Sequence, residues 1–119
     1  MKTDNLIVVK TFEFSLSIID FFIQLKEEKE FIISKQLLKS STSIGANVEE
    51  AIAAQSKKDF INKMSIAAKE ARETKYWLRL LDQSKLTNLD CDSYLREIEN
   101  ILKIISKIII TSINSLEKP

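Results

Sequence analysis

Glycine and proline are almost absent from this chain: Gly45 and Pro119 are the only ones in 119 residues. β-Hairpins and other tight turns commonly need glycine, proline or an Asn-Gly or Asp-Gly pair, so a sandwich or barrel of many strands is very hard to build from this sequence. Glycine-rich phosphate-binding loops are excluded for the same reason, because one glycine cannot make the P-loop or the Rossmann type. The expected fold is therefore all-α.

Apolar residues recur at spacings of three and four, the period of an α-helix, in four stretches of the chain. We expect helices over residues 4–26, 34–54, 57–83 and 90–116, joined by short polar connections. Ser34 and Ser56 are the expected N-caps of the second and third helices, and Ser56 with Asp59 resembles a capping box. Short connections make consecutive helices antiparallel neighbours. The sequence thus predicts one domain, 1–119, folded as an up-down-up-down four-helix bundle.

The residues needed for most enzyme chemistry are missing. The chain has no histidine and one cysteine, Cys91, which removes Ser-His-Asp and Cys-His nucleophiles and the commonest general base. Glu70 and Glu73 lie one helical turn apart, but a di-metal bundle normally completes such a pair with histidine. We therefore expect no enzymatic activity, no metal and no cofactor, and we interpret Cys91 as a small core residue.

No segment reads as a membrane span or a signal peptide. The apolar run at 104–113 is interrupted by Lys107 and is too short to cross a bilayer. Residues 1–10 lack the basic start and the cleavage site of a secretory signal. The expected protein is soluble and cytoplasmic, and does not contact membranes.

The helix expected at 4–26 carries two apolar stripes on nearly opposite sides, where a surface helix of a monomeric bundle should carry one. We expect the first stripe to face the bundle core; it contains Val9, Phe12, Leu16, Ile19 and Ile23. We expect the second to lie between subunits; it contains Ile7, Phe14, Ile18, Phe21 and Leu25. The helix at 57–83 repeats the feature, with Ile66, Trp77 and Leu80 outside its core face. Since large exposed apolar patches mark interaction sites, these residues predict a homo-oligomer.

Positive charge is concentrated in residues 57–85, which hold eight basic and four acidic residues, although the whole chain has a net charge of +1. Within about 120° around the helix at 57–83 lie Lys57, Lys58, Lys69, Arg72, Lys75 and Arg79. Such an arc suits a phosphate backbone, and it is equally typical of a solvated face with acidic partners.

Small polar residues share one side of the helix expected at 34–54. They are Ser43, Asn47 and Glu50. They could contact a ligand or RNA, but we favour a polar seam between helices or between subunits, because buried polar groups must be paired.

Four segments of the chain carry a family resemblance: SSTSIGANVEEA at 40–51, SKKDFI at 56–61, IAAKEARET at 66–74 and YWLRLL at 76–81. Together they resemble the bacterial four-helix-bundle family of 23S rRNA intervening-sequence proteins. The accessory variability determinant of diversity-generating retroelements is related to that family. The resemblance is strongest over residues 37–81 and implies an antiparallel bundle that assembles into a ring of five around a channel. It also implies binding of nucleic acid or protein, and no catalytic residues.

The residues and the resemblance together predict a non-enzymatic, ring-like homo-oligomer, a pentamer by the resemblance, that serves as an interaction scaffold. Non-specific binding of RNA or DNA is expected through the basic face of the helix at 57–83. The alternative is an adaptor that binds another protein and no nucleic acid.

Overall fold

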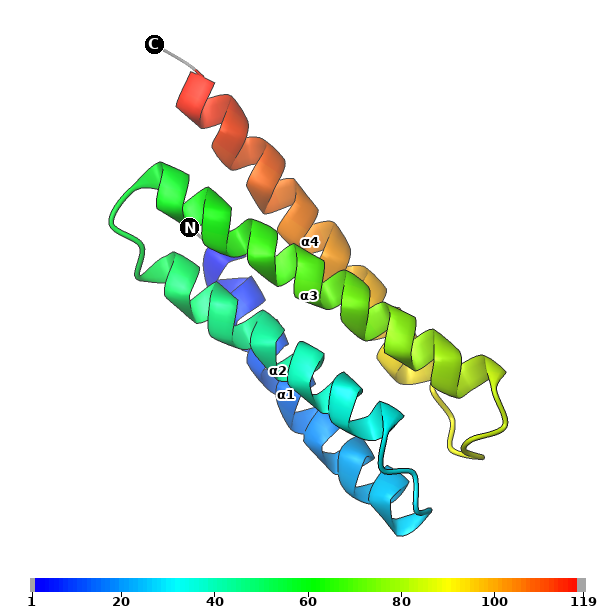
Figure 1. Ribbon diagram of the computed structural model, residues 1–119. Coiled ribbons are helices and arrows are strands. Elements are labelled where there is room, and N and C mark those ends of the chain that lie inside the picture. The colour runs from blue at the N-terminus through cyan, green and yellow to red at the C-terminus, as the bar shows by residue number, and fades with distance from the viewer. Residues whose placement is uncertain (1, 118–119) are drawn as a thin grey trace.

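The computed structural model describes residues 2–117, which form four α-helices and, over this range, no strand. The helices are α1, Lys2–Glu27; α2, Ile33–Ile52; α3, Lys57–Gln83; and α4, Asp92–Glu117. Their direction alternates along the chain, as the colours in Figure 1 show. The predicted all-α bundle of four helices is confirmed, and each helix begins and ends within two residues of its predicted bounds.

The helices occupy the corners of an elongated bundle measuring 55 × 22 × 21 Å. α1 packs against α2 and α4, and α3 packs against the same two helices. Over the described residues no Cα atom of α1 lies within 8 Å of one in α3, and the same holds for α2 and α4, so each of these pairs is diagonal. The α2–α3 contact is the most extensive and the α1–α4 contact the least. The end of α4 projects beyond the start of α1 (Figure 1).

The two apolar stripes of α1 have exchanged the roles predicted for them. The stripe assigned to a subunit interface lies inside the bundle, and its residues are at most 2% exposed: Ile7, Phe14, Ile18, Phe21 and Leu25. Phe21 stacks on Tyr94 of α4 with ring centroids 4.4 Å apart. Thr11 interrupts the stripe without cost because its hydroxyl donates to the Ile7 carbonyl at 2.7 Å. The interface prediction for these five residues was therefore wrong, and the other stripe faces outward.

The predicted cap at the start of α3 is confirmed, and the one at the start of α2 is wrong. Ser56 Oγ accepts a hydrogen bond from the Asp59 N–H at 3.0 Å. Ser34 lies inside the first turn of α2, and its hydroxyl donates to the Glu30 carbonyl at 2.8 Å. The Glu30 carboxylate instead accepts hydrogen bonds from the first N–H groups of the helix. A glutamate side chain therefore supplies the cap that serine was expected to supply.

α1 ends in a left-handed turn at a residue that is not glycine. The Lys29 N–H donates to the Lys26 carbonyl and the Glu30 N–H to the Leu25 carbonyl, both at 2.9 Å, which is a Schellman motif. Lys29 occupies the position usually held by glycine and has a φ of 66°. The side chain of any L-residue is strained at this angle.

Replacing Lys29 with glycine is expected to stabilise the chain. Lys29→Gly relieves the strain of the positive φ and should raise the free energy of unfolding by about 0.5–1 kcal/mol. Lys26→Gly, three residues earlier and inside α1, is the control, because it should lower the same quantity by up to about 1 kcal/mol. Urea denaturation followed by circular dichroism measures both. An unchanged or lowered midpoint for Lys29→Gly would contradict the assignment.

Candidate interaction surfaces

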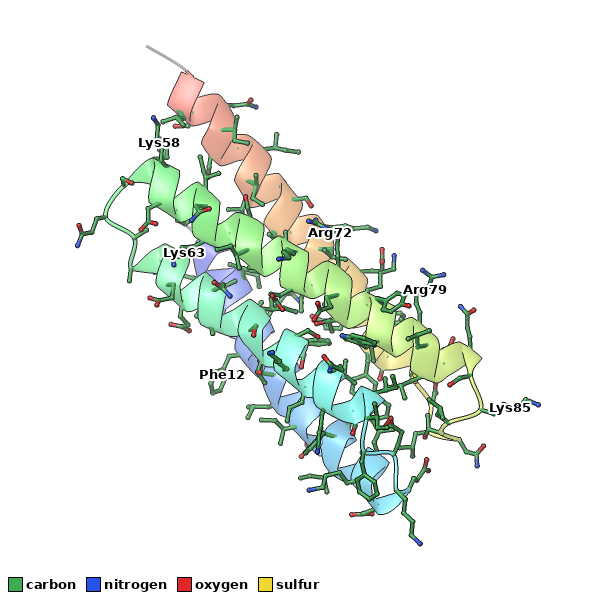
Figure 2. All side chains as sticks on the ribbon, in the orientation of Figure 1. Phe12, Lys58, Lys63, Arg72, Arg79 and Lys85 are labelled. Carbon is green, nitrogen blue, oxygen red and sulfur yellow. The ribbon has the colours of Figure 1, made fainter. Side chains whose placement is uncertain are left out.

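An apolar stripe runs along the outer face of α1, and we call its five residues the α1 stripe. Each of them is between 39% and 60% exposed: Val9, Phe12, Leu16, Ile19 and Ile23. Phe12, the most exposed, points away from the other helices in Figure 2. Scattered apolar residues are normal on a surface, but a continuous row of large ones marks a contact site.

The α1 stripe has the spacing of a coiled-coil seam. Its residues follow one another at intervals of three, four, three and four, which are the a and d positions of a heptad. One rim of the stripe is acidic, because Glu13, Asp20 and Glu27 recur every seven residues at the e position. All three carboxylates are exposed. The outer face of α1 is thus shaped for another helix and is negatively charged along one side.

The basic residues predicted on α3 lie on its outer face, with one exception. Lys57, Lys58, Lys69, Arg72 and Arg79 are exposed. Lys75 is half-buried and forms an ion pair with Glu99 of α4. Figure 2 shows Lys58, Arg72 and Arg79 along the side of α3 that faces away from Phe12. The two outer faces of the diagonal helices α1 and α3 are therefore opposite in position and in charge.

α4 extends the positive surface beyond the basic residues that were predicted from the sequence. Arg96, Lys103 and Lys107 are exposed on the outer side of this helix. They follow one another at intervals of seven and four, on the side away from the buried isoleucines. This helical spacing was visible in the sequence and could have identified them. The exposed basic residues thus cover two adjacent helices.

A hollow of about 440 Å³ opens on the outer face of α4 among these basic residues. Ile110, which is 60% exposed, lies at one end of it. Its lining is formed by Glu99, Leu102, Lys103, Ser106, Lys107, Ile110 and Thr111. The lining combines the aliphatic side chains of Leu102 and Ile110 with two lysines and with Glu99, whose carboxylate pairs with Lys75.

The residues of the predicted polar seam bond to their own helix. Ser43 Oγ donates to the Lys39 carbonyl and Asn47 Nδ2 donates to the Ser43 carbonyl, both at 2.8 Å, and Glu50 is exposed. The buried polar contact between α2 and α3 is made instead by the hydroxyls of Ser40 and Thr74, 2.8 Å apart. The prediction that Ser43, Asn47 and Glu50 form a polar seam, between helices or between subunits, stays a prediction.

Ile66, Trp77 and Leu80 are half-buried along α3. Trp77 packs against the core, and its ring meets the Tyr76 ring edge to face with centroids 5.2 Å apart. The Nε1 atom of Trp77 is buried and has no hydrogen-bond partner among the described residues. Tyr76 is 53% exposed. The predicted contact of this side with another subunit stays a prediction.

Cys91 is 1% exposed and packs in the core. Burial, together with the smaller effect of the carboxylates of Asp82, Asp90 and Asp92, raises the pKa of its thiol to about 11. The thiol is therefore protonated at neutral pH and is a poor nucleophile.

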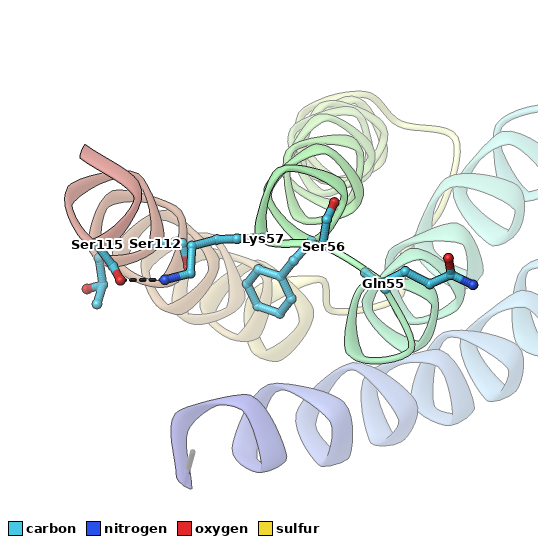
Figure 3. Close-up of a pocket in the computed structure, with 8 residues that line it drawn as sticks. Gln55, Ser56, Lys57, Ser112 and Ser115 are labelled. Atoms are coloured by element: carbon cyan, nitrogen blue, oxygen red, sulfur yellow. Dashed lines mark hydrogen bonds between the residues drawn. The ribbon is translucent and has the colours of Figure 1, made fainter. Parts of the chain in front are cut away.

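Another hollow lies at the end of the bundle, between the start of α3 and the end of α4 (Figure 3). It measures about 450 Å³ and is lined by Ala54, Gln55, Ser56, Lys57, Phe60, Thr111, Ser112 and Ser115. A hydrogen bond from Lys57 Nζ to Ser115 Oγ, 2.5 Å long, crosses it. The lining contains no carboxylate to serve as a general base beside the lysine.

Over residues 2–117 there is no cluster of three potential metal ligands, and no helix has an apolar stretch sufficient to cross a membrane.

Comparison with known proteins agrees with this architecture. The sequence pattern of the 23S rRNA-intervening sequence protein family matches residues 3–107. A crystal structure of a protein of unknown function from the S23 ribosomal protein family of Bacteroides thetaiotaomicron is similar, with 44% identity and a TM-score of 0.82. The match covers 90% of this chain and 97% of that one. A search of curated proteins finds no match. The resemblance of the four sequence segments is confirmed, and the chain belongs to the 23S rRNA-intervening sequence protein family.

Proposed function

We propose that the protein is a non-enzymatic scaffold that assembles from copies of itself and binds the phosphate backbone of RNA or DNA. The observation that carries the proposal is the α1 stripe, a row of large apolar residues in heptad spacing on the outside of the bundle. In a monomer these apolar side chains stay exposed to water, which is unfavourable. The contact between copies is therefore expected at the α1 stripe and not at the buried stripe that the sequence had suggested.

The basic face of α3 supports the second half of the proposal. Its exposed lysines and arginines lie on the helix diagonal to α1, so a contact at the α1 stripe leaves them open to a ligand. Phosphates release counterions when such a face binds them, which gives affinity with little sequence preference. Each further copy adds an equivalent face, and several weak contacts on one nucleic acid reinforce one another. A ring, a pentamer by the family resemblance, would present these faces around one axis.

Assembly is tested by placing charges in the α1 stripe. Phe12→Asp with Leu16→Asp should convert the oligomer to monomers that keep their helical circular dichroism, because both side chains are outside the core. Gln36→Glu, exposed on α2, is the control for added negative charge. Light scattering gives the mass of each protein. A wild-type monomer at micromolar concentration would reject self-assembly.

Nucleic-acid binding is tested by reversing charge on α3. Arg72→Glu with Arg79→Glu should abolish binding, while Lys35→Glu with Lys39→Glu, the same charge change on exposed residues of α2, should weaken it far less. Fluorescence anisotropy with single- and double-stranded RNA and DNA at about 50 mM salt, then at rising salt, gives the affinities and their steep salt dependence. If none of the four binds, the protein is an adaptor for another protein, for which the α1 stripe already offers a helix-binding face.

A further inference from the structure

The acidic rim of the α1 stripe restricts what can cover it. Glu13, Asp20 and Glu27 form a row along one side of the stripe, and no ion pair joins them to any side chain that the structure describes. Opposite charges beside a coiled-coil seam set the choice and the orientation of the partner. A matching surface needs apolar groups in its centre and cations beside them.

A second α1 does not provide that surface. When two copies of a heptad helix pack antiparallel, the e positions of one face the e positions of the other. The three carboxylates would then oppose carboxylates, and like charges at such positions are unfavourable. When the copies pack parallel, the e row faces the g row, which contains Val8, Ser15 and Phe22 and no cation. A two-fold contact through α1 alone therefore leaves the acidic rim unpaired.

The outer face of α4 has the required chemistry. Arg96 and Lys103 are exposed and seven residues apart, which is the spacing of Glu13 and Asp20 on α1. Beside them lies the hollow of about 440 Å³ bordered by Ile110. Both helices are 26 residues long, so either one is long enough to run along the other over these positions.

We propose that the α1 stripe of one copy docks on the outer face of α4 of a second copy. A large side chain of the stripe enters the hollow on α4, and Glu13 and Asp20 lie opposite Arg96 and Lys103. This inference rests on the proposed self-assembly and specifies the receiving surface. The two contacting surfaces differ, so the contact is heterologous, and each copy can offer one surface to each of two neighbours.

The position of the two helices in the bundle gives the contact a consequence for shape. α1 and α4 occupy adjacent corners, so their outer faces point in different directions, whereas the faces of diagonal helices point in opposite ones. A heterologous contact between such faces turns each copy relative to the last, and it gives a ring if the rotation closes and a helical filament if it does not. In both arrangements the docking of α1 on α4 leaves the outer face of α3 open.

Charge exchange between the two faces tests the pairing. Glu13→Lys with Asp20→Lys, and separately Arg96→Glu with Lys103→Glu, should each weaken assembly about tenfold or more, because like charges then meet. The variant that carries all four substitutions restores opposite charges and should recover assembly close to wild type. Lys35→Glu with Lys39→Glu on α2 is the control and should leave the mass unchanged. All these side chains are exposed, so circular dichroism should be unaffected.

The outcomes separate this inference from the proposed function. If wild type is a monomer by sedimentation velocity, self-assembly fails, and the docking fails with it. If wild type assembles and either double variant keeps its mass, the pairing of α1 with α4 is overturned and the scaffold stands. If both double variants dissociate and the fourfold variant stays dissociated, the two faces do not oppose each other, and the pairing is again overturned.

Cross-linking gives a second measurement that does not depend on charge. Leu16→Cys protein mixed with Glu99→Cys protein under mild oxidation should give a disulfide-linked pair of chains, because Leu16 lies between Glu13 and Asp20 at the same spacing that places Glu99 between Arg96 and Lys103. Leu16→Cys mixed with Lys35→Cys is the control and should not link. The native Cys91 is buried and its raised pKa keeps it unreactive. Equal linkage in both mixtures would count against the docking.

Discussion

Phe14→Ala is expected to lower the free energy of unfolding by about 3–5 kcal/mol, whereas Phe12→Ala should change it by less than about 1 kcal/mol. The two phenylalanines are two residues apart on the same helix, but Phe14 is 2% exposed and Phe12 is 60% exposed. Removing the Phe14 ring leaves a cavity in the core. Removing the exposed Phe12 ring from the monomer leaves no cavity and only reduces the apolar surface that is in contact with water.

Thermal or urea unfolding measures the two effects. The samples should be dilute, because assembly through the α1 stripe would add its own free energy to the stability of any protein that keeps Phe12. Ile18→Ala and Ile19→Ala form a second matched pair, with Ile18 buried and Ile19 39% exposed. Equal destabilisation by the two members of either pair would show that the buried and exposed stripes had been assigned incorrectly.

Glu30→Ala is expected to lower the free energy of unfolding by about 2 kcal/mol. The carboxylate of Glu30 accepts hydrogen bonds from the N–H groups of Ile32, Ile33 and Ser34, at 3.1, 2.6 and 3.2 Å. Glu30 is 7% exposed, so alanine would leave donors at the start of α2 without a partner and with little access to water.

Two further variants check the role of this carboxylate. Glu30→Gln keeps an oxygen acceptor and should be destabilised less than Glu30→Ala. Glu73→Ala removes an exposed glutamate from the middle of α3 and should cost less than about 0.5 kcal/mol. Equilibrium denaturation followed by circular dichroism ranks the three variants. If Glu30→Ala were as stable as Glu73→Ala, the cap would contribute nothing to folding.

Helix positions followed from the sequence because apolar spacing and connecting residues are local properties. Ser56 and Asp59 lie three residues apart, so their hydrogen bond could be predicted from the chain itself. The cap of α2 could not, because Glu30 acts from outside the helix through its long side chain, and it does so after the left-handed turn at Lys29. That turn depends on a conformation that lysine seldom adopts.

The orientation of α1 was not available from the sequence, because both of its stripes have helical spacing and similar apolar residues. The inward stripe is selected by distant partners, such as Tyr94, which stacks on Phe21 from the opposite end of the chain. Thr11 stands between buried residues of this stripe, and its hydroxyl is satisfied within the helix, so a polar residue at this position is compatible with burial. The candidate contact surface on α4 was overlooked for a different reason: positive charge was sought only in the segment where it is most concentrated.

The unequal packing of the four helices has a consequence for how the chain opens. α1 shares its smallest contact with α4, while α2 and α3 are held together by the most extensive contact in the bundle. Detaching α1 or α4 as a unit therefore breaks less of the packing than detaching α2 or α3, and such partial unfolding follows the weakest boundaries of a fold.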